Sequence, residues 1–246
     1  AEALAFPLST EEVSALLRYA HEHRVPVTPR GAGTNLVGST VPLEGGVILD
    51  LSRMDRVLEL DEDTMTVTVE PGMLLQDLQA YVEARGLFYP PDPGEKASSI
   101  GGNISTNAGG MRAVRYGLTR DFVRCIEAVL PDGEIVQFSS NVVKNTTGYD
   151  VKDLVIGSEG TLGIITELTL KLIPAPKETI SLIIPYENLE DCIATVPKFF
   201  MNHFQPQAVE FMEKEIVLAS ERYLGKSVFP KQVEGVDIGA YLLVTF

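Results

Sequence analysis

The chain has 246 residues, of which 45% are hydrophobic and 22% are charged, and its formal net charge is −14. This composition is that of a globular protein with one large or two smaller domains, and no window approaches the roughly 18 uninterrupted apolar residues of a membrane-spanning helix. The excess of carboxylates argues against nucleic acid as a partner, because phosphate neutralisation needs clustered Lys and Arg. No basic segment followed by an apolar one opens the sequence, so we expect no secretory signal.

Side chains suited to metal or nucleophilic chemistry are scarce. The two cysteines, Cys125 and Cys192, lie far apart, which argues against a disulfide framework or an iron–sulfur cluster and favours the reducing cytoplasm. Of the three histidines, His21 and His23 are two residues apart on a predicted helix and do not share a face, and His203 is interpreted as a helix-end residue. We therefore predict no metal site and expect a cofactor to supply any difficult chemistry.

The first third of the chain predicts a helix followed by strands. Ser9 and Glu12 have the spacing of a capping box, and the apolar residues that follow have helical spacing to about Arg24. Further elements are expected as strands at 25–28, 46–51, 57–60 and 65–69, and as a helix at 74–85 that is stopped by Gly86.

The remainder predicts a hairpin, a long strand and a second domain. Residues 89–117 are rich in Pro, Gly, Ser and Asn and are expected to be irregular. Strands at 125–130 and 134–138 flank the turn Pro131-Asp132-Gly133, a long strand is expected at 162–173, and Pro174 and Pro176 mark a boundary. Beyond it we expect a strand at 181–184, a helix at 188–199, a strand at 208–212, a helix at 214–223 and a strand at 241–246. Because the sequence begins with Ala1 and ends inside an apolar strand, we interpret it as part of a longer chain.

Three segments contain glycines and small polar residues where a core would place hydrophobic ones. The first, Pro29 to Gly38, follows a strand, and its glycines let the backbone turn N–H groups outward, as a diphosphate requires. A dinucleotide fingerprint is rejected because the third glycine, Gly38, comes two residues late and no helix follows. A phosphate-binding Walker loop is rejected because no Lys precedes Ser39. Taken alone, the segment is also compatible with an ordinary surface turn.

The other two segments favour a common ligand over three unrelated turns. The second, 90–110, is a long loop with two Gly-Gly pairs, and loops of this length in compact domains are more often functional or disordered. The third consists of 144–150 and 157–167, with glycines that cost stability in a strand unless a close backbone approach needs them. Three such loops around one ligand imply a long molecule such as a dinucleotide. Glu159, within the third segment, is interpreted as a partner of loop amides rather than as an acid or base.

In combination, these motifs are specific. The segments P-R-G-A-G-T-N at 29–35, S-I-G-G-N-x-x-T-N-A-G-G at 99–110 and G-S-E-G-T-L-G-I-I-T-E at 157–167 resemble the FAD-binding domain of the vanillyl-alcohol oxidase and p-cresol methylhydroxylase flavoprotein family. They are most similar to the branch of that family that contains glycolate oxidase, D-lactate dehydrogenase and D-2-hydroxyglutarate dehydrogenase. The resemblance implies an α+β fold, with a two-lobed FAD-binding domain of the p-cresol methylhydroxylase (PCMH) type at 1–176 and the beginning of a ferredoxin-like cap domain at 177–246.

The resemblance also implies which residues contact FAD. The backbone of the first segment would hold the pyrophosphate, the second would line the flavin and ribityl side, and the third would lie nearer the adenine and ribityl end. No His lies near Thr34, so non-covalent binding is expected. The cofactor-binding candidates are Arg30, Gly31, Ala32, Gly33, Thr34, Asn35, Pro91, Ser99, Gly101, Gly102, Asn103, Thr106, Asn107, Gly109, Gly110, Gly160, Thr161, Gly163 and Ile164.

The implied activity is FAD-dependent oxidation of a D-2-hydroxy acid such as D-lactate, glycolate or D-2-hydroxyglutarate to the 2-oxo acid. Electrons would pass from the flavin to a partner protein or a quinone, and an acidic surface suits a basic partner. The substrate-binding, metal-binding and catalytic residues of this branch have no matching positions here, so the catalytic residues stay unassigned. Two alternatives remain open, a non-catalytic FAD-binding subunit and an FAD-dependent alkyl transferase of the same family. Oligomerisation is possible in each case.

Overall fold

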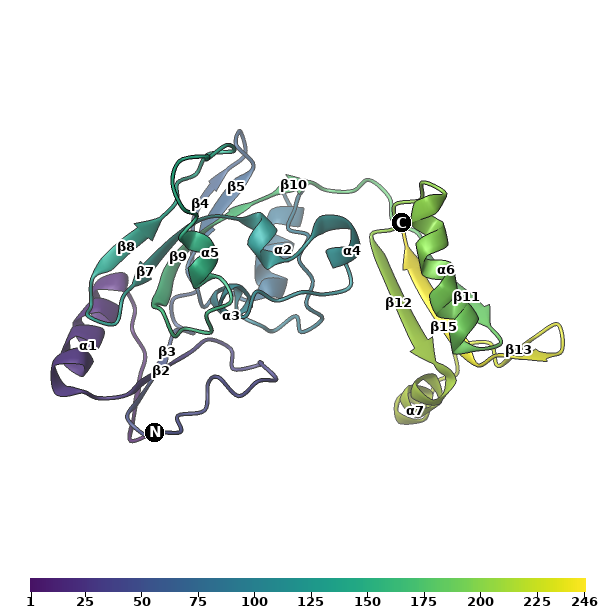
Figure 1. Cartoon of the computed structure of the whole chain (residues 1–246), viewed down its shortest axis with the longest axis horizontal. Coiled ribbons are helices and arrows are strands. Elements are labelled where there is room, and N and C mark those ends of the chain that lie inside the picture. The colour runs from purple at the N-terminus through teal and green to yellow at the C-terminus, as the bar shows by residue number, and fades with distance from the viewer. The chain divides into compact units, whose positions relative to one another are not determined.

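The computed structural model describes all of residues 1–246, and they form two compact units (Figure 1). Unit 1 contains Ala1–Gly110 and Leu118–Ala175, and unit 2 contains Met111–Gly117 and Pro176–Phe246. The main division therefore falls between Pro174 and Pro176, and one short earlier stretch belongs by its contacts to unit 2. Both units mix helices with sheets, as the expected α+β class requires.

The first lobe of unit 1 is a three-stranded parallel sheet in the order β1-β3-β2, on which helix α1 packs. The predicted helix start is confirmed, since the Ser9 hydroxyl accepts a hydrogen bond from Glu12 N at 3.3 Å and the Glu12 carboxylate accepts one from Leu8 N at 2.7 Å. Arg24 ends the helix in a left-handed conformation with φ 55°. The bounds are β1 Ala3–Ala5, α1 Thr10–His23, β2 Val27–Arg30 and β3 Val47–Asp50.

The second lobe is a five-stranded antiparallel sheet in the order β4-β5-β9-β7-β8. The predicted hairpin is confirmed, because Gly133 adopts φ 87° in the turn between β7 and β8. The bounds are β4 Val57–Asp61, β5 Thr66–Val69, β7 Val123–Val129, β8 Ile135–Phe138 and β9 Ile164–Lys171. Beside them lie α2 Leu75–Glu83 and a small ladder of β6 Leu87–Phe88 with β10 Ile173–Pro174.

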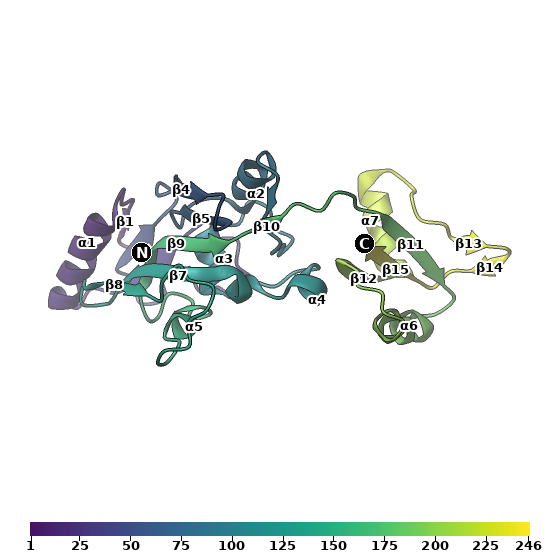
Figure 2. The same cartoon turned by 90° about the horizontal axis from the view of Figure 1, so that it is seen from above.

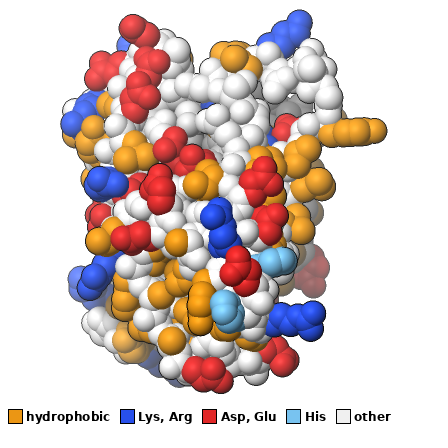
Figure 3. All heavy atoms as spheres, turned by 90° about the vertical axis from the view of Figure 1, so that its left-hand side faces the viewer, with side chains coloured by type: hydrophobic (Ala, Val, Ile, Leu, Met, Phe, Trp, Pro, Cys, Tyr) orange, Lys and Arg blue, Asp and Glu red, His pale blue; other side chains and the backbone are white.

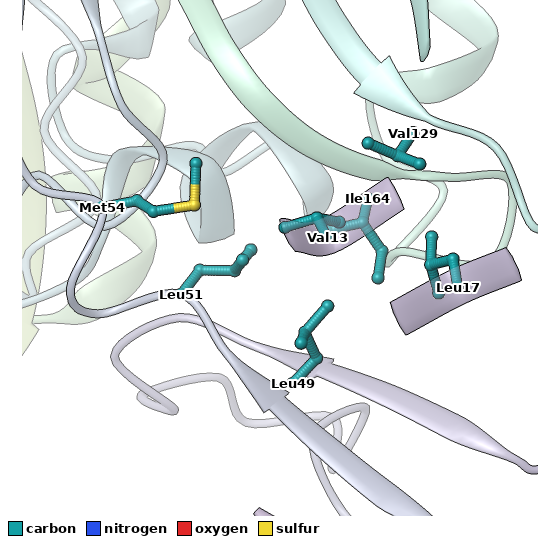
Figure 4. Close-up of a cluster of buried hydrophobic side chains, with 7 residues drawn as sticks. All are labelled: Val13, Leu17, Leu49, Leu51, Met54, Val129 and Ile164. Atoms are coloured by element: carbon teal, nitrogen blue, oxygen red, sulfur yellow. The ribbon is translucent and has the colours of Figure 1, made fainter. Parts of the chain in front are cut away.

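One apolar cluster joins the two lobes of unit 1. Figure 4 shows side chains of α1, β3, β7 and β9 directed toward one another, and all of them are buried. Complete burial of one such side chain stabilises a fold by about 1.5–3 kcal/mol, so the cluster fixes the lobes against each other. Its members are Val13, Leu17, Leu49, Leu51, Met54, Val129 and Ile164.

The expectation that 89–117 is irregular is wrong in part. The stretch contains helix α3 (Ile100–Ser105) and helix α4 (Ala113–Tyr116), and a 3-10 helix, η1 (Thr119–Phe122), follows it. The Ser99 hydroxyl caps α3 by accepting a hydrogen bond from Gly102 N at 3.3 Å. A Cβ on Gly101 would lie 2.5 Å from Pro71 Cβ, so glycine is needed here because the helix packs against Pro71. Glycine composition therefore indicated close packing at this point and not an irregular backbone.

Unit 2 is built around a three-stranded sheet in the order β11-β15-β12. Both outer strands run antiparallel to β15, so β11 and β12 are parallel to each other with helix α6 connecting them. This is the split β-α-β arrangement of ferredoxin-like folds. The bounds are β11 Ser181–Tyr186, α6 Leu189–Met201, β12 Ala208–Glu213, α7 Lys214–Leu224 and β15 Ala240–Thr245.

The two helices of unit 2 pack on opposite faces of this sheet, as Figure 2 shows. Helix α6 places Cys192 on the face formed by Ala240, Leu242 and Val244, whereas Val217 of α7 packs against Tyr241. Alternation along β15 explains the separation, because successive side chains of a strand point to opposite faces.

Several other short elements were also not predicted from the sequence, among them β1, β6, one further helix and one further hairpin. Helix α5 covers Lys152–Val155, and strands β13 (Gln232–Val233) and β14 (Val236–Asp237) form a hairpin. The hairpin turns at Glu234 and Gly235, with φ 52° and 82°, as a two-residue primed turn requires. The chain has no helix of sufficient length and apolarity to cross a membrane.

The surface carries its excess negative charge in a dispersed form on at least one face. Figure 3 views the end of unit 1 that carries α1, and there Asp and Glu side chains are scattered among basic and apolar ones. The net charge of −14 is therefore not gathered into one acidic patch on this face.

Glu167 of β9 is a half-buried carboxylate in the sheet of the second lobe, and other carboxylates surround it. Burial first, and then the charges of Glu127, Glu70 and Glu59, raise the pKa of Glu167. A folded-state pKa above the unfolded value means that the ionised side chain costs stability at pH 7 and that the cost disappears as pH falls through this pKa. We expect Glu167→Gln to raise the melting temperature of unit 1 at pH 7 by about 1–2 °C, because solvent screens a partly exposed group.

Differential scanning calorimetry at pH 7 and pH 4 measures this effect. The difference between Glu167→Gln and the parent chain should shrink at pH 4, where the carboxyl is largely protonated in both states. Glu22→Gln, on the exposed side of α1, is the matched control and should leave the transition unchanged at both pH values. A melting temperature lowered by Glu167→Gln at pH 7 would contradict the assignment.

Candidate functional site

A cavity of about 530 Å³ lies within unit 1 where the three glycine-rich segments meet. It is bordered by the loop after β2, by α3 with the residues on either side of it, and by the turn that leads into β9. Segments far apart in the sequence are thus brought together as expected. Sixteen of the predicted residues line it: Arg30, Gly31, Ala32, Gly33, Thr34, Asn35, Ser99, Gly101, Gly102, Asn103, Thr106, Asn107, Gly109, Gly160, Gly163 and Ile164.

Three predicted residues lie elsewhere. Pro91 is buried, and its carbonyl accepts a hydrogen bond from Gln79 Nε2 at 3.2 Å. Gly110 packs against the backbone of Asp92, whose carbonyl oxygen would lie 1.7 Å from a Cβ at this position. Thr161 lines a neighbouring hollow. Residues 144–150 of the third segment do not line the cavity.

One hydroxyl group connects the first two segments. The Ser99 Oγ accepts hydrogen bonds from Ala32 N at 3.2 Å and from Gly102 N at 3.3 Å, and its side chain is almost completely buried. A Cβ on Gly31 would lie only 2.1 Å from this oxygen. Glycine at 31 is therefore required for the loop to approach α3, independently of any ligand.

The first loop presents hydrogen-bond donors and one cation to the cavity. The N–H groups of Gly33 and Thr34 make no hydrogen bond within the chain. The Arg30 guanidinium lies over Gly33, where a Cβ would be 2.6 Å from Nη2, and it is held by Asp50 at an Nε–Oδ2 distance of 3.5 Å. Free amides beside a fixed guanidinium suit an anionic group such as a phosphate. Among the lining residues, Arg30 is the one cation, so backbone donors dominate.

Asn35 lines the cavity, and its side chain also makes three hydrogen bonds within its own loop. Its Oδ1 accepts hydrogen bonds from Gly38 N at 2.8 Å and Ser39 N at 3.2 Å, and its Nδ2 donates to Thr40 Oγ1 at 3.3 Å. The side chain therefore closes a turn within its own loop. This turn holds Leu36 fully exposed at the edge of the cavity.

A polar network that the sequence did not reveal holds the second segment in place. Lys96 Nζ donates to Asp92 Oδ1 at 2.6 Å and to Gln79 Oε1 at 3.2 Å, and Gln79 Nε2 donates to the carbonyls of Tyr89 and Pro91. Gln79 and Asp92 are both buried. Since Gln79 belongs to α2, the network fixes the start of the loop to a helix. Its members all lie between residues 79 and 96 and carry no recognisable motif.

A second hollow of about 800 Å³ adjoins the cavity. Six residues line both spaces: Pro29, Ser39, Glu159, Gly160, Gly163 and Ile164. The hollow is lined by apolar residues of α1 and β2 together with His21, Arg24 and Thr28, and the cavity is lined mainly by the small residues of the glycine-rich segments. The two spaces together suit an elongated ligand with an apolar end and an anionic middle, and FAD fits this description.

The contact between Gly31 and Ser99 predicts non-additive stability changes. Gly31→Ala should cost about 1–3 kcal/mol, because the new methyl group displaces a buried hydroxyl from two amides. In the background of Ser99→Ala, where the obstructing oxygen is absent, the same substitution should cost about 1 kcal/mol less.

Chemical denaturation of the two single variants and the double variant measures this coupling. Gly109→Ala serves as control, since a Cβ there would meet only Leu118 Cδ2 at 3.4 Å. Its effect should stay below about 0.5 kcal/mol. Strictly additive costs for Gly31→Ala and Ser99→Ala would contradict the geometry.

Comparison with known proteins agrees with this architecture. The chain is 59% identical over 245 residues to a D-lactate dehydrogenase of Anaerostipes hadrus, covering 100% of this chain and 52% of that protein. It is 44% identical over 223 residues to the glycolate oxidase subunit GlcD of Bacillus subtilis (strain 168), covering 90% and 47%. A D-2-hydroxyglutarate dehydrogenase of Stutzerimonas stutzeri (strain A1501) is 36% identical over 245 residues, with coverage of 99% and 52%. The chain thus spans about half the length of the curated relatives it matches.

A solved structure supports the fold alone. An alkyldihydroxyacetonephosphate synthase superposes with a TM-score of 0.83 at 23% sequence identity, over 99% of this chain and 46% of that one. Residues 1–139 match the family described as "FAD binding domain", and residues 175–246 match "FAD linked oxidases, C-terminal domain". The chain therefore belongs to the FAD-linked oxidases, and FAD is the cofactor of the domain that contains the cavity.

Proposed function

We propose that the protein to which this chain belongs oxidises a D-2-hydroxy acid to the corresponding 2-oxo acid. The observation that carries the proposal is the convergence of the three glycine-rich segments on one cavity, in a chain 59% identical to a D-lactate dehydrogenase. A bound flavin would supply the two-electron acceptor that this oxidation requires. The substrate is proposed to be of the D-lactate, glycolate or D-2-hydroxyglutarate type.

The residues of this chain bind and orient the cofactor. We assign the free amides of Gly33 and Thr34, with the Arg30 guanidinium, to the diphosphate. Small residues of α3 and its flanks would allow the close approach of a flat ring system, and donors fixed before binding need no rearrangement. In the absence of a histidine near the first loop, the attachment would be non-covalent. No residue of the cavity is assigned as a catalytic base.

We further propose that electrons leave to a separate protein or a quinone and that the protein acts in the cytoplasm. Both cysteines are buried free thiols, which suits a reducing compartment. Alkyl transfer is not favoured, because the likeness to the synthase extends to the fold alone. A non-catalytic FAD-binding subunit is separated from the enzyme by the second experiment below.

Arg30 provides a test of the proposed diphosphate site. Arg30→Gln should weaken FAD binding by about tenfold, because it removes a charge-assisted hydrogen bond. Titration calorimetry of the flavin-free protein measures the dissociation constant. Arg56→Gln, which breaks the ion pair of Arg56 with Glu70 at 2.8 Å, should leave it unchanged. Equal dissociation constants for Arg30→Gln and the parent protein would remove Arg30 from the site.

The catalytic proposal is tested on the full-length protein. Acid precipitation should release the flavin absorbance into the supernatant if the binding is non-covalent. Addition of D-lactate, D-2-hydroxyglutarate or glycolate without oxygen should then bleach the bound flavin, and L-lactate should not. Bound flavin that none of these acids bleaches would favour the non-catalytic subunit.

A further inference from the structure

Glu159 adopts a backbone conformation that glutamate rarely takes. Its φ is 55°, in the left-handed region, where the Cβ of an L-residue comes too close to the following carbonyl oxygen. The backbone is held there on both sides, because Glu159 N donates to Ser105 O at 2.8 Å and Gly157 N donates to Ile104 O at 3.0 Å. The turn is thus anchored to α3, and glycine would satisfy it with less strain.

The side chain of Glu159 is not used within the chain. The carboxylate is exposed, makes no hydrogen bond or ion pair, and lines both the cavity and the adjoining hollow. The expectation that it bonds to loop amides is therefore not met: its backbone N–H bonds to Ser105 O, and its carboxylate has no partner. A strained residue that presents a free charge to two adjoining spaces indicates a role toward a ligand.

The surfaces on either side of Glu159 indicate which part of a ligand its carboxylate would contact. On one side, Leu17, Ala20 and Val27 of the hollow offer an apolar surface that suits a base, beside the polar residues His21, Arg24 and Thr28 of the same lining. On the other side, the cavity contains the free amides of Gly33 and Thr34, which suit phosphates. In a nucleotide the sugar lies between base and phosphate. An ionised carboxylate only accepts hydrogen bonds, so it pairs with hydroxyl donors and repels phosphate.

We propose that Glu159 recognises the cofactor by accepting hydrogen bonds from the vicinal hydroxyls of its adenosine ribose. The inference rests on the FAD binding of the proposed function, but not on the substrate or on the redox reaction. It makes Glu159 a specificity-determining residue for the nucleotide end of the cofactor. The ribityl chain of the flavin has the same hydroxyl chemistry and is separated from ribose by the choice of ligands below.

The test compares nucleotide binding to the flavin-free, full-length protein by titration calorimetry. The parent protein should bind ADP about five- to tenfold more tightly than 2′-deoxy-ADP, since a charge-assisted hydrogen bond is lost. Glu159→Gln should weaken FAD and ADP by about tenfold and bring the ratio of the two nucleotides close to one. Glu234→Gln is the matched control, because Glu234 is also an exposed glutamate in the left-handed region, with φ 52°, but lines neither the cavity nor the hollow.

A second variant separates recognition from folding. Glu159→Gly should leave the melting temperature of the flavin-free protein unchanged or raise it by up to about 3 °C, because strain is relieved, while FAD binding still weakens. Unchanged binding of FAD and ADP in Glu159→Gln would overturn the inference. Weakened binding of FMN with unchanged ADP would overturn the assignment to ribose and transfer it to the ribityl chain. Failure of the acids to bleach the flavin would refute the proposed oxidation alone.

Discussion

The site depends on the hydroxyl of Ser99. This group accepts hydrogen bonds from Ala32 N and Gly102 N, so it caps α3 and at the same time fixes the loop after β2. The apolar cluster in Figure 4 packs the two lobes of unit 1 against each other. These apolar contacts do not by themselves determine how the loop after β2 lies against α3. The hydrogen bonds of Ser99 determine that arrangement at the edge of the cavity. Its position in turn requires glycine at 31, where any side chain would meet its oxygen.

The sequence predicted those helices, turns and strands that depend on residues close together in the chain. The cap at Ser9, the turn at Gly133 and the apolar run of β15 each depend on residues within a few positions, and all three were identified from the sequence. The glycine-rich segments predicted that a long ligand binds unit 1. Helix α3 was missed because Gly101 and Gly102 disfavour helices in isolation, whereas here Gly101 allows close packing on Pro71. The ion pair of Arg30 with Asp50 and the network around Lys96 depend on long-range contacts that a single sequence does not show.

A chain with a net charge of −14 that binds a diphosphate must keep its carboxylates away from the phosphate-binding groups. In this structure Arg30 is the one cation of the lining, and the other donors are amides whose dipoles need no counter-charge. Glu159 and Glu95 are the anions of the lining, and the structure gives them different surroundings. The carboxylate of Glu95 accepts a hydrogen bond from Ala97 N within its own loop, whereas that of Glu159 has no partner within the chain. Negative charge is thus kept away from the amides and guanidinium of the first loop, and one unpaired carboxylate, that of Glu159, lies elsewhere in the lining.

The sheet orders β1-β3-β2, β4-β5-β9-β7-β8 and β11-β15-β12 share one property. In each of them the strand that comes last in the sequence lies between strands made earlier. During synthesis, each central strand is therefore made after its neighbours. The facing edges of β5 and β7 stay unpaired until β9 is synthesised, and those of β11 and β12 stay unpaired until β15 is synthesised. Such edges promote association with other chains, and late long-range pairing slows folding. Nascent forms of this protein that lack β9 or β15 should accordingly depend on chaperones more than the finished units do.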